Sequence, residues 1–114
     1  MRIRSSNLKI EQKATIFAAL GDPTRLMLVS KLTDKKAHSI SALTDGTELS
    51  RQAITKHLTV LENVGLVSKI KYGRESLYEL DPKPLKSLQD HLDIIASHWE
   101  NALSSLKDFV EKES

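Results

Sequence analysis

The chain has no cysteine and no long apolar run. Without a thiol among its 114 residues, it can form no disulfide, no thiolate metal site and no cysteine nucleophile. No apolar stretch approaches the roughly 18 residues that span a bilayer, and no signal peptide opens the sequence. A glycine-rich phosphate loop and paired carboxylates in a cleft-like arrangement are also missing. We therefore expect one cytoplasmic domain over residues 1–114 that is not an enzyme, needs no cofactor and does not enter a membrane.

The charge that is present is unevenly distributed. The formal net charge is only +2, but residues 50–74 contain five basic residues against one acidic residue, a local net charge of +4. Residues 81–114 contain four lysines against seven acidic residues, a local net charge of −3. A basic middle segment predicts a surface for a polyanion, and the acidic last segment predicts a separate task.

Cap and turn residues divide the chain into helices and one hairpin. Asp22, Ser39, Ser50 and Asp81 each precede an expected helix and can cap its free N–H groups, and Gly65 is an expected left-handed helix stop. The expected helices are 9–20, 23–32, 40–44, 51–63 and 82–113, the strands are 66–71 and 76–80 with a turn over 72–75, and residues 1–8 form a flexible arm. The predicted fold is mainly α with a β-hairpin, a winged helix-turn-helix.

Apolar residues at helical spacing predict which side of each helix is apolar. In the helix over 51–63 this stripe must face the core and consists of Ile54, Leu58 and Leu61. The corresponding residues of the first two helices are Ile10, Ala14, Phe17 and Leu20, and Leu26, Val29 and Leu32.

The opposite side of the 51–63 helix carries amide, hydroxyl and ammonium groups, which suit the donor and acceptor pattern of the major groove. We expect Gln52, Thr55 and Lys56 to reach base edges, and Arg51 and the Ser50 backbone to touch phosphate. The alternative is an ordinary solvated face, which the neighbouring helix and basic hairpin make less favoured. The predicted DNA-binding residues are Ser50, Arg51, Gln52, Thr55, Lys56, His57, Thr59, Lys71 and Arg74.

The predictions for His57 and for the basic hairpin each have an alternative. His57 lies at the edge of the buried stripe and is either a packing histidine with one satisfied nitrogen or a phosphate contact. At the hairpin, Lys69, Lys71 and Arg74 are basic, and Arg74 is the candidate for a flanking minor groove. The alternative there is solvated charge that protects an edge strand from aggregation.

The last helix has the pattern of an assembly element. Apolar residues alternate by three and four from Leu85 to Phe109, an a/d seam of nearly four heptads. At 1.5 Å per residue the helix would be roughly 45 Å long, more than so small a core can cover. We expect the first helix to cover part of it and a second copy of the chain the rest. The predicted dimerisation residues are Phe17, Leu88, Leu92, Ile95, Trp99, Leu106 and Phe109.

Three segments resemble one known family. ALGDPTRLMLVSKL (19–32), LSRQAITKHLTVLENVGLV (49–67) and GRESLYELDP (73–82) are similar to the ArsR/SmtB family of winged-helix repressors. The tail resembles the branch whose last helix carries a tryptophan, here Trp99, followed by leucines. The resemblance implies a homodimer, joined through its first and last helices, that binds double-stranded DNA at a palindromic operator and represses transcription.

The metal sites of that family have no clear counterpart here. By alignment, Ser39 and Ser41 occupy the positions of the sensing cysteines, and serine is a poor ligand for zinc or arsenic. On the last helix Asp90 and His91 are adjacent rather than spaced by one, and His98 follows two turns later. We therefore expect no metal, although ligands from two chains of a dimer are not excluded by the sequence.

Two other hypotheses remain open. A winged helix used as a protein-interaction module would keep the fold but bind duplex DNA no better than a generic cationic protein. A small-molecule-responsive regulator would hold an unknown effector in a pocket between the first and last helices, around Phe17, Trp99 and Phe109. The +4 segment argues against the first, and packing of these aromatic residues in a dimer core is preferred over the second.

Overall fold

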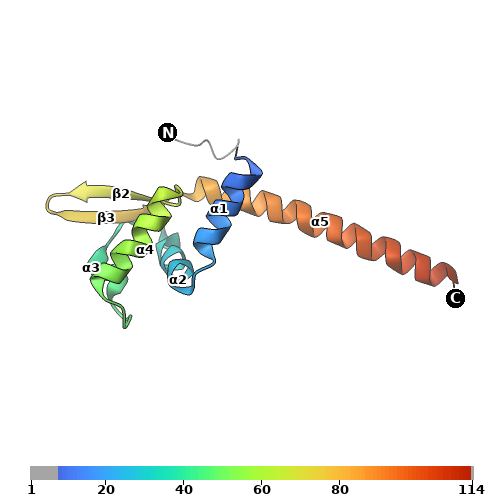
Figure 1. Cartoon of the computed structure of the whole chain (residues 1–114), viewed down its shortest axis with the longest axis horizontal. Coiled ribbons are helices and arrows are strands. Elements are labelled where there is room, and N and C mark those ends of the chain that lie inside the picture. The colour runs from blue at the N-terminus through green and yellow to red at the C-terminus, as the bar shows by residue number, and fades with distance from the viewer. Residues whose placement is uncertain (1–7, 114) are drawn as a thin grey trace.

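A computed structural model describes residues 8–113; the arm predicted over residues 1–8 falls outside this range except for Leu8, which packs against the core. The elements in chain order are α1 (Ile10–Leu20), α2 (Pro23–Lys31), the 3-10 helix η2 (Leu32–Asp34), β1 (His38–Ser39), α3 (Ile40–Thr44), α4 (Arg51–Asn63), β2 (Val67–Tyr72), β3 (Glu75–Leu80) and α5 (Pro82–Glu113). Figure 1 shows a helical head from which the β2–β3 hairpin and α5 extend in opposite directions. The predicted mainly α fold with a β-hairpin is confirmed.

The predicted helix caps are present. Asp22 Oδ2 accepts the N–H groups of Thr24 and Arg25 at 2.9 and 3.0 Å, and Pro23 occupies the first turn of α2. The Ser39 and Ser50 hydroxyls and the Asp81 carboxylate cap α3, α4 and α5 in the same way at 3.1 Å. These bonds satisfy N–H groups that have no partner inside a helix, and so they fix where each helix begins.

The core differs in part from the apolar stripes read off the sequence. Val29 and Leu32 are buried as expected, but Leu26 is 53% exposed, and α2 buries Leu28 in its place. In α1 the buried residues are Ile16 and Ala19 rather than the predicted stripe. Both helices carry apolar residues on more than one side, so spacing alone did not show which side faces the core.

The hairpin belongs to a three-stranded antiparallel sheet with the order β1-β3-β2. The strands pair directly up to Tyr72 and Glu75, so the loop is the two residues Gly73 and Arg74 rather than the predicted four. Gly73 has a φ of +63°, which a tight turn requires and glycine adopts without strain. The third strand, β1, was not predicted because two residues are too short to show an alternating pattern.

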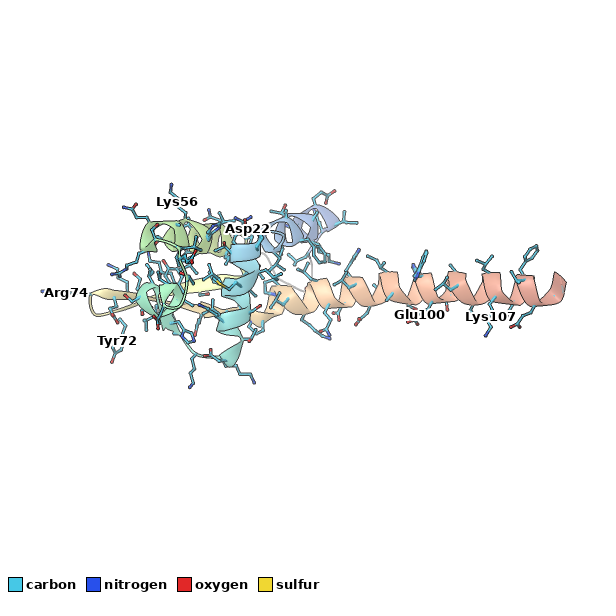
Figure 2. The ribbon with its side chains drawn as sticks, turned by 90° about the horizontal axis from the view of Figure 1, so that it is seen from below. Asp22, Lys56, Tyr72, Arg74, Glu100 and Lys107 are labelled. Carbon is cyan, nitrogen blue, oxygen red and sulfur yellow. The ribbon has the colours of Figure 1, made fainter. Side chains whose placement is uncertain are left out.

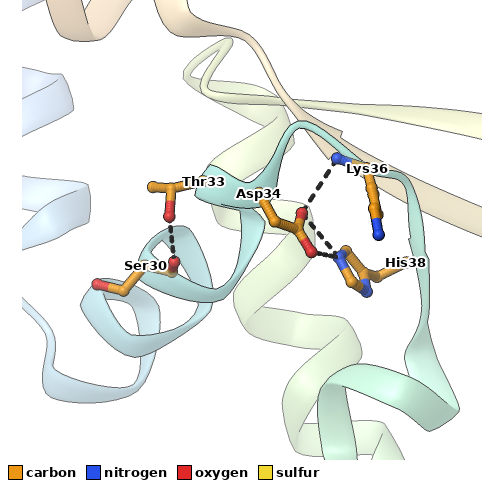
Figure 3. A network of polar contacts seen from close by, with 5 residues as sticks. All are labelled: Ser30, Thr33, Asp34, Lys36 and His38. Carbon is orange, nitrogen blue, oxygen red and sulfur yellow. Dashed lines mark hydrogen bonds and ion pairs between the residues drawn. The ribbon is translucent and has the colours of Figure 1, made fainter.

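A small polar network holds the segment between α2 and β1, as Figure 3 shows. Asp34 accepts the backbone N–H of Lys36 at 3.0 Å, and His38 Nε2 lies 2.8 and 3.0 Å from its two carboxylate oxygens. The hydrogen bond from Lys36 is the main cause of a lowered pKa at Asp34. Because His38 pairs with Tyr78 of β3, this network ties the end of α2 to the base of the hairpin.

The helix α5 leaves the head after its first turns. Pro84 and Leu88 are buried, whereas every residue from Leu92 to Lys112 is exposed. The chain measures 70 Å along its longest axis, and its radius of gyration of 18.8 Å exceeds the roughly 13 Å expected for a globular chain of this length. Leu88, predicted to contact a partner, is 3% exposed and belongs to the core of its own chain.

Replacement of Asp22 with alanine should destabilise the protein in a pH-dependent way. Its hydrogen bond from the Arg25 backbone is the first cause of a pKa lowered from the ordinary 3.8. A carboxyl group with a lowered pKa contributes stability above its unfolded pKa and loses it as the pH falls through the folded value. Urea unfolding should show a wild-type advantage at pH 6 that shrinks below pH 3.8; a gap that stays constant to pH 2.5 would contradict this prediction.

Candidate DNA interface

The outer face of α4 (Gln52, Lys56, Thr59 and Asn63) is exposed along the whole helix. The opposite side is held by the full burial of Ile54, Leu58 and Leu61, as predicted. Lys56 projects away from the head in Figure 2, with no other element in front of it. A protruding helix with a polar face of this kind has the form of an element that enters the major groove.

The two threonines of α4 are restricted in the hydrogen bonds that they can offer. The Thr55 hydroxyl donates to the Arg51 carbonyl at 2.7 Å, and the Thr59 hydroxyl donates to the Thr55 carbonyl at 3.0 Å. Since each hydroxyl has a single hydrogen, both side chains present only an acceptor and a methyl group outward. These groups match the exocyclic amino group of adenine or cytosine and the methyl group of thymine.

The N-terminus of α4 adjoins a shallow, open hollow of about 530 Å³. Its wall is made by the end of α3, the turn that follows and Arg51, and includes the hydroxyl residues Ser41, Thr44 and Thr47 and the acidic Asp45. The free N–H groups of the first turn of α4 and the Arg51 guanidinium suit a phosphate rather than a base. Sequence reasoning gave Ser50 and Arg51 this role but did not identify the hollow beside them.

The strand register determines which hairpin side chains face the same way as α4. Lys69 and Lys71 stand opposite Tyr78 and Ser76 and share the face on which Tyr78 is buried against the core. Tyr72 points to the other face and is 75% exposed, and Figure 2 shows it directed away from the side of Lys56, with Arg74 at the tip. The lysines of the hairpin therefore lie on the strand face that is turned toward the core, and Tyr72 lies on the opposite face. The exposed aromatic residue was not anticipated.

The structure brings His57 into a polar cluster at the side of α4. Its Nδ1 lies 3.2 Å from Arg25 Nη1 and 3.8 Å from Asp22 Oδ2, and its side chain is 26% exposed. Arg25 also donates through Nε to the Ala19 carbonyl at 2.6 Å. One ring nitrogen of His57 is thus satisfied within the chain, as the packing alternative expected, while a phosphate contact stays a prediction. Arg25 had given no signal in the sequence beyond its place after Pro23.

The distal part of α5 carries an exposed apolar seam, defined here as Leu92, Ile95, Trp99, Leu103, Leu106, Phe109 and Val110. Phe17 of α1 is half-buried against the core of its own chain. Because Trp99 and Phe109 are both exposed, they do not enclose a pocket with Phe17 within one chain. Within residues 8–113 no group of three or more His, Cys, Asp or Glu side chains is arranged to hold a metal ion.

The fold and this face define the class of protein, a winged helix-turn-helix DNA-binding protein, and the comparisons agree. A family model described as a helix-turn-helix domain matches residues 20–70. The chain is 37% identical over 82 residues to YuzN, an uncharacterized HTH-type transcriptional regulator of Bacillus subtilis, with 67% of this chain and 89% of that protein covered. None of the helices in residues 8–113 is both long and apolar enough to cross a membrane.

A solved structure gives the family, and a further relative agrees. An ArsR-like transcriptional regulator from Rhodococcus sp. RHA1 is 35% identical, with 87% of this chain and 92% of that chain covered and a TM-score of 0.73. A transcriptional repressor of Mycobacterium tuberculosis, SmtB, is 27% identical over 94 residues, with 82% of this chain and 67% of that protein covered. The chain belongs to the ArsR/SmtB family of transcriptional regulators, and it is a DNA-binding regulator rather than an enzyme.

Replacement of Lys71 with glutamine should weaken binding to every duplex and flatten its salt dependence. Loss of one phosphate contact lowers the slope of log affinity against log salt by about 0.9. The matched control is Lys107 to glutamine on α5, a lysine at the other end of the molecule in Figure 2. Anisotropy titrations at three salt concentrations measure both slopes. If the two variants have equal slopes of log affinity against log salt, Lys71 makes no phosphate contact and the wing is not part of the interface.

Proposed function

We propose that the protein is a homodimeric transcriptional repressor that binds an inverted-repeat operator through α4 and the wing. The observation that carries the proposal is the orientation of the two: Lys69 and Lys71 lie on the face of the hairpin opposite to Tyr72, and Figure 2 shows Tyr72 directed away from the side of Lys56 on α4. In this arrangement α4 would read bases through Gln52, Thr55 and Lys56. The wing and the N-terminus of α4 would hold the flanking phosphates.

The dimer is supported by the continuity of α5. The apolar stripe that seals the core at Leu85 and Leu88 continues without interruption into the seam, which none of residues 8–113 covers. An exposed apolar stripe of this length marks an interaction surface. α1, which packs against α5, adds the exposed Ile10 and Ala14 beside it. A second copy of the same stripe is its natural cover, because a two-fold interface joins identical patches.

A two-fold dimer accounts for the form of the operator. Two α4 helices related by the two-fold axis would enter successive major grooves about one helical turn of DNA apart, so the half-sites would be inverted repeats. Repression follows if the operator overlaps a promoter, and the mycobacterial relative is named a repressor. The protein would act in the compartment that holds its DNA.

The proposal is tested with a fluorescent duplex that carries the upstream region of the protein's own gene, against a scrambled duplex, at two salt concentrations. We expect tighter binding to the native duplex that persists at the higher salt. Equal and steeply salt-dependent binding to both duplexes would leave only the phosphate contribution. Micromolar or weaker binding to all duplexes at physiological salt would favour a protein-interaction module instead.

Substitution of adjacent isoleucines separates dimerisation from folding. Ile94 and Ile95 are 53% and 52% exposed, but only Ile95 lies on the seam, because one residue turns a helix by about 100°. Ile95→Glu should shift the protein to monomer in analytical ultracentrifugation at micromolar concentration and weaken operator binding at least tenfold. Ile94→Glu should leave both unchanged. A dimer that tolerates glutamate at both positions would exclude this interface.

A further inference from the structure

We propose that Arg25 is a positioning residue that fixes the tautomer of His57 and thereby makes His57 a neutral hydrogen-bond donor to a DNA phosphate at the edge of the recognition helix. The inference rests on the proposed function, because it assigns a further contact to the same interface.

Guanidinium is always a donor and has no acceptor atom. The 3.2 Å contact between Arg25 Nη1 and His57 Nδ1 is therefore a hydrogen bond only if Nδ1 carries a lone pair. The proton of the neutral imidazole must then sit on Nε2. The Arg25 guanidinium is itself held from the other side, since its Nε donates to the Ala19 carbonyl at 2.6 Å. Because the guanidinium is held next to Nδ1 and can only donate, Nδ1 stays the acceptor and the ring proton stays on Nε2.

The second ring nitrogen of His57 is left for an external partner. Among the described residues no hydrogen bond or ion pair engages Nε2, and no buried side-chain nitrogen or oxygen lacks a partner. Nε2 is therefore accessible from solvent, in agreement with the 26% exposure of the side chain. The inner ring nitrogen, Nδ1, accepts a hydrogen bond from Arg25, and the N–H at Nε2 faces solvent. This N–H can therefore donate to an acceptor outside the chain.

The position of His57 favours phosphate as the acceptor. On α4 it lies one residue after Lys56, on the flank between the buried stripe and the outer face. Side chains at the flank of a recognition helix meet the walls of the groove, where the phosphates lie, rather than the base edges at its floor. The Asp22 carboxylate nearby would repel a phosphate, and the Arg25 guanidinium beside it offsets that charge.

The tautomer is measured directly on the DNA-free protein. Nitrogen-15 NMR at pH 8 distinguishes a protonated from an unprotonated ring nitrogen. Comparison with His57→Gln assigns the signals among the four histidines. We expect Nδ1 of His57 to be unprotonated, and we expect the two tautomers to mix in Arg25→Met. A protonated Nδ1 in the unaltered protein would overturn the proposal, whatever the protein binds.

The phosphate contact is tested by two amide substitutions. The amide nitrogen of glutamine approximates Nε2 of histidine, whereas that of asparagine approximates Nδ1. Affinity for the operator at pH 8 should fall less than twofold in His57→Gln and about 3- to 10-fold in His57→Asn, the effect of one lost hydrogen bond. Because the donor is neutral, the salt slope should not change. Thermal unfolding of both variants shows whether they fold alike.

The outcomes separate this inference from the function that it extends. Equal affinity of wild type and His57→Asn would make His57 a packing residue and overturn the contact. A salt slope lowered by about 0.9 in His57→Asn would show a cationic contact and overturn the neutral donor. If the unaltered protein shows no sequence preference, the proposed repressor fails first, and the NMR result still decides whether Arg25 sets the tautomer. If Arg25→Met does not fold, the two His57 variants retain the test.

Discussion

The rotation of α4 about its own axis determines what this molecule can recognise, and burial of three side chains sets that rotation. Ile54, Leu58 and Leu61 are fully buried, and each contributes about 1.5–3 kcal/mol by leaving water. An exposed polar side chain of α4 contributes far less to stability. The apolar side therefore decides the orientation, and Gln52, Lys56 and Thr59 face outward because of what lies opposite them. Residues on the outer face of α4 can then vary without loss of the fold.

Burial of apolar side chains also sets the direction of α5. Its first turns place Leu88 in the core, so the direction in which the helix leaves the head is fixed by folding. The remaining turns carry the same stripe into solvent, where it costs free energy until it is covered. The part of α5 that packs in the core and the exposed seam thus belong to one apolar pattern. For this reason Leu88 and Trp99, which share a heptad pattern, have different environments.

Sequence patterns predicted the elements well where one signal dominated. The caps at Asp22, Ser39, Ser50 and Asp81 fixed where helices begin, since the chemistry of a cap is local. The patterns failed where several faces were apolar, as for Leu26, or where an element was stabilised only by distant partners, as for β1. In the candidate site, helical spacing predicted the exposed side of α4. It could not reveal the contact of Arg25 with His57, because 32 residues separate them and only the packing of α2 on α4 joins them.

That contact also bears on how the two proposed tasks are connected. α1 packs against α5 on one side and against α2 on the other, and α2 packs against α4. A change in the angle between two heads would therefore reach α4 through α1 and α2. Arg25 donates hydrogen bonds to a carbonyl of α1 and to a ring of α4, so it spans that path with one side chain. In the proposed dimer, the contacts of α1 with α5 and of α2 with α1 and α4 would connect the seam to α4, so half-site spacing would depend on the geometry of the head as well as on α5.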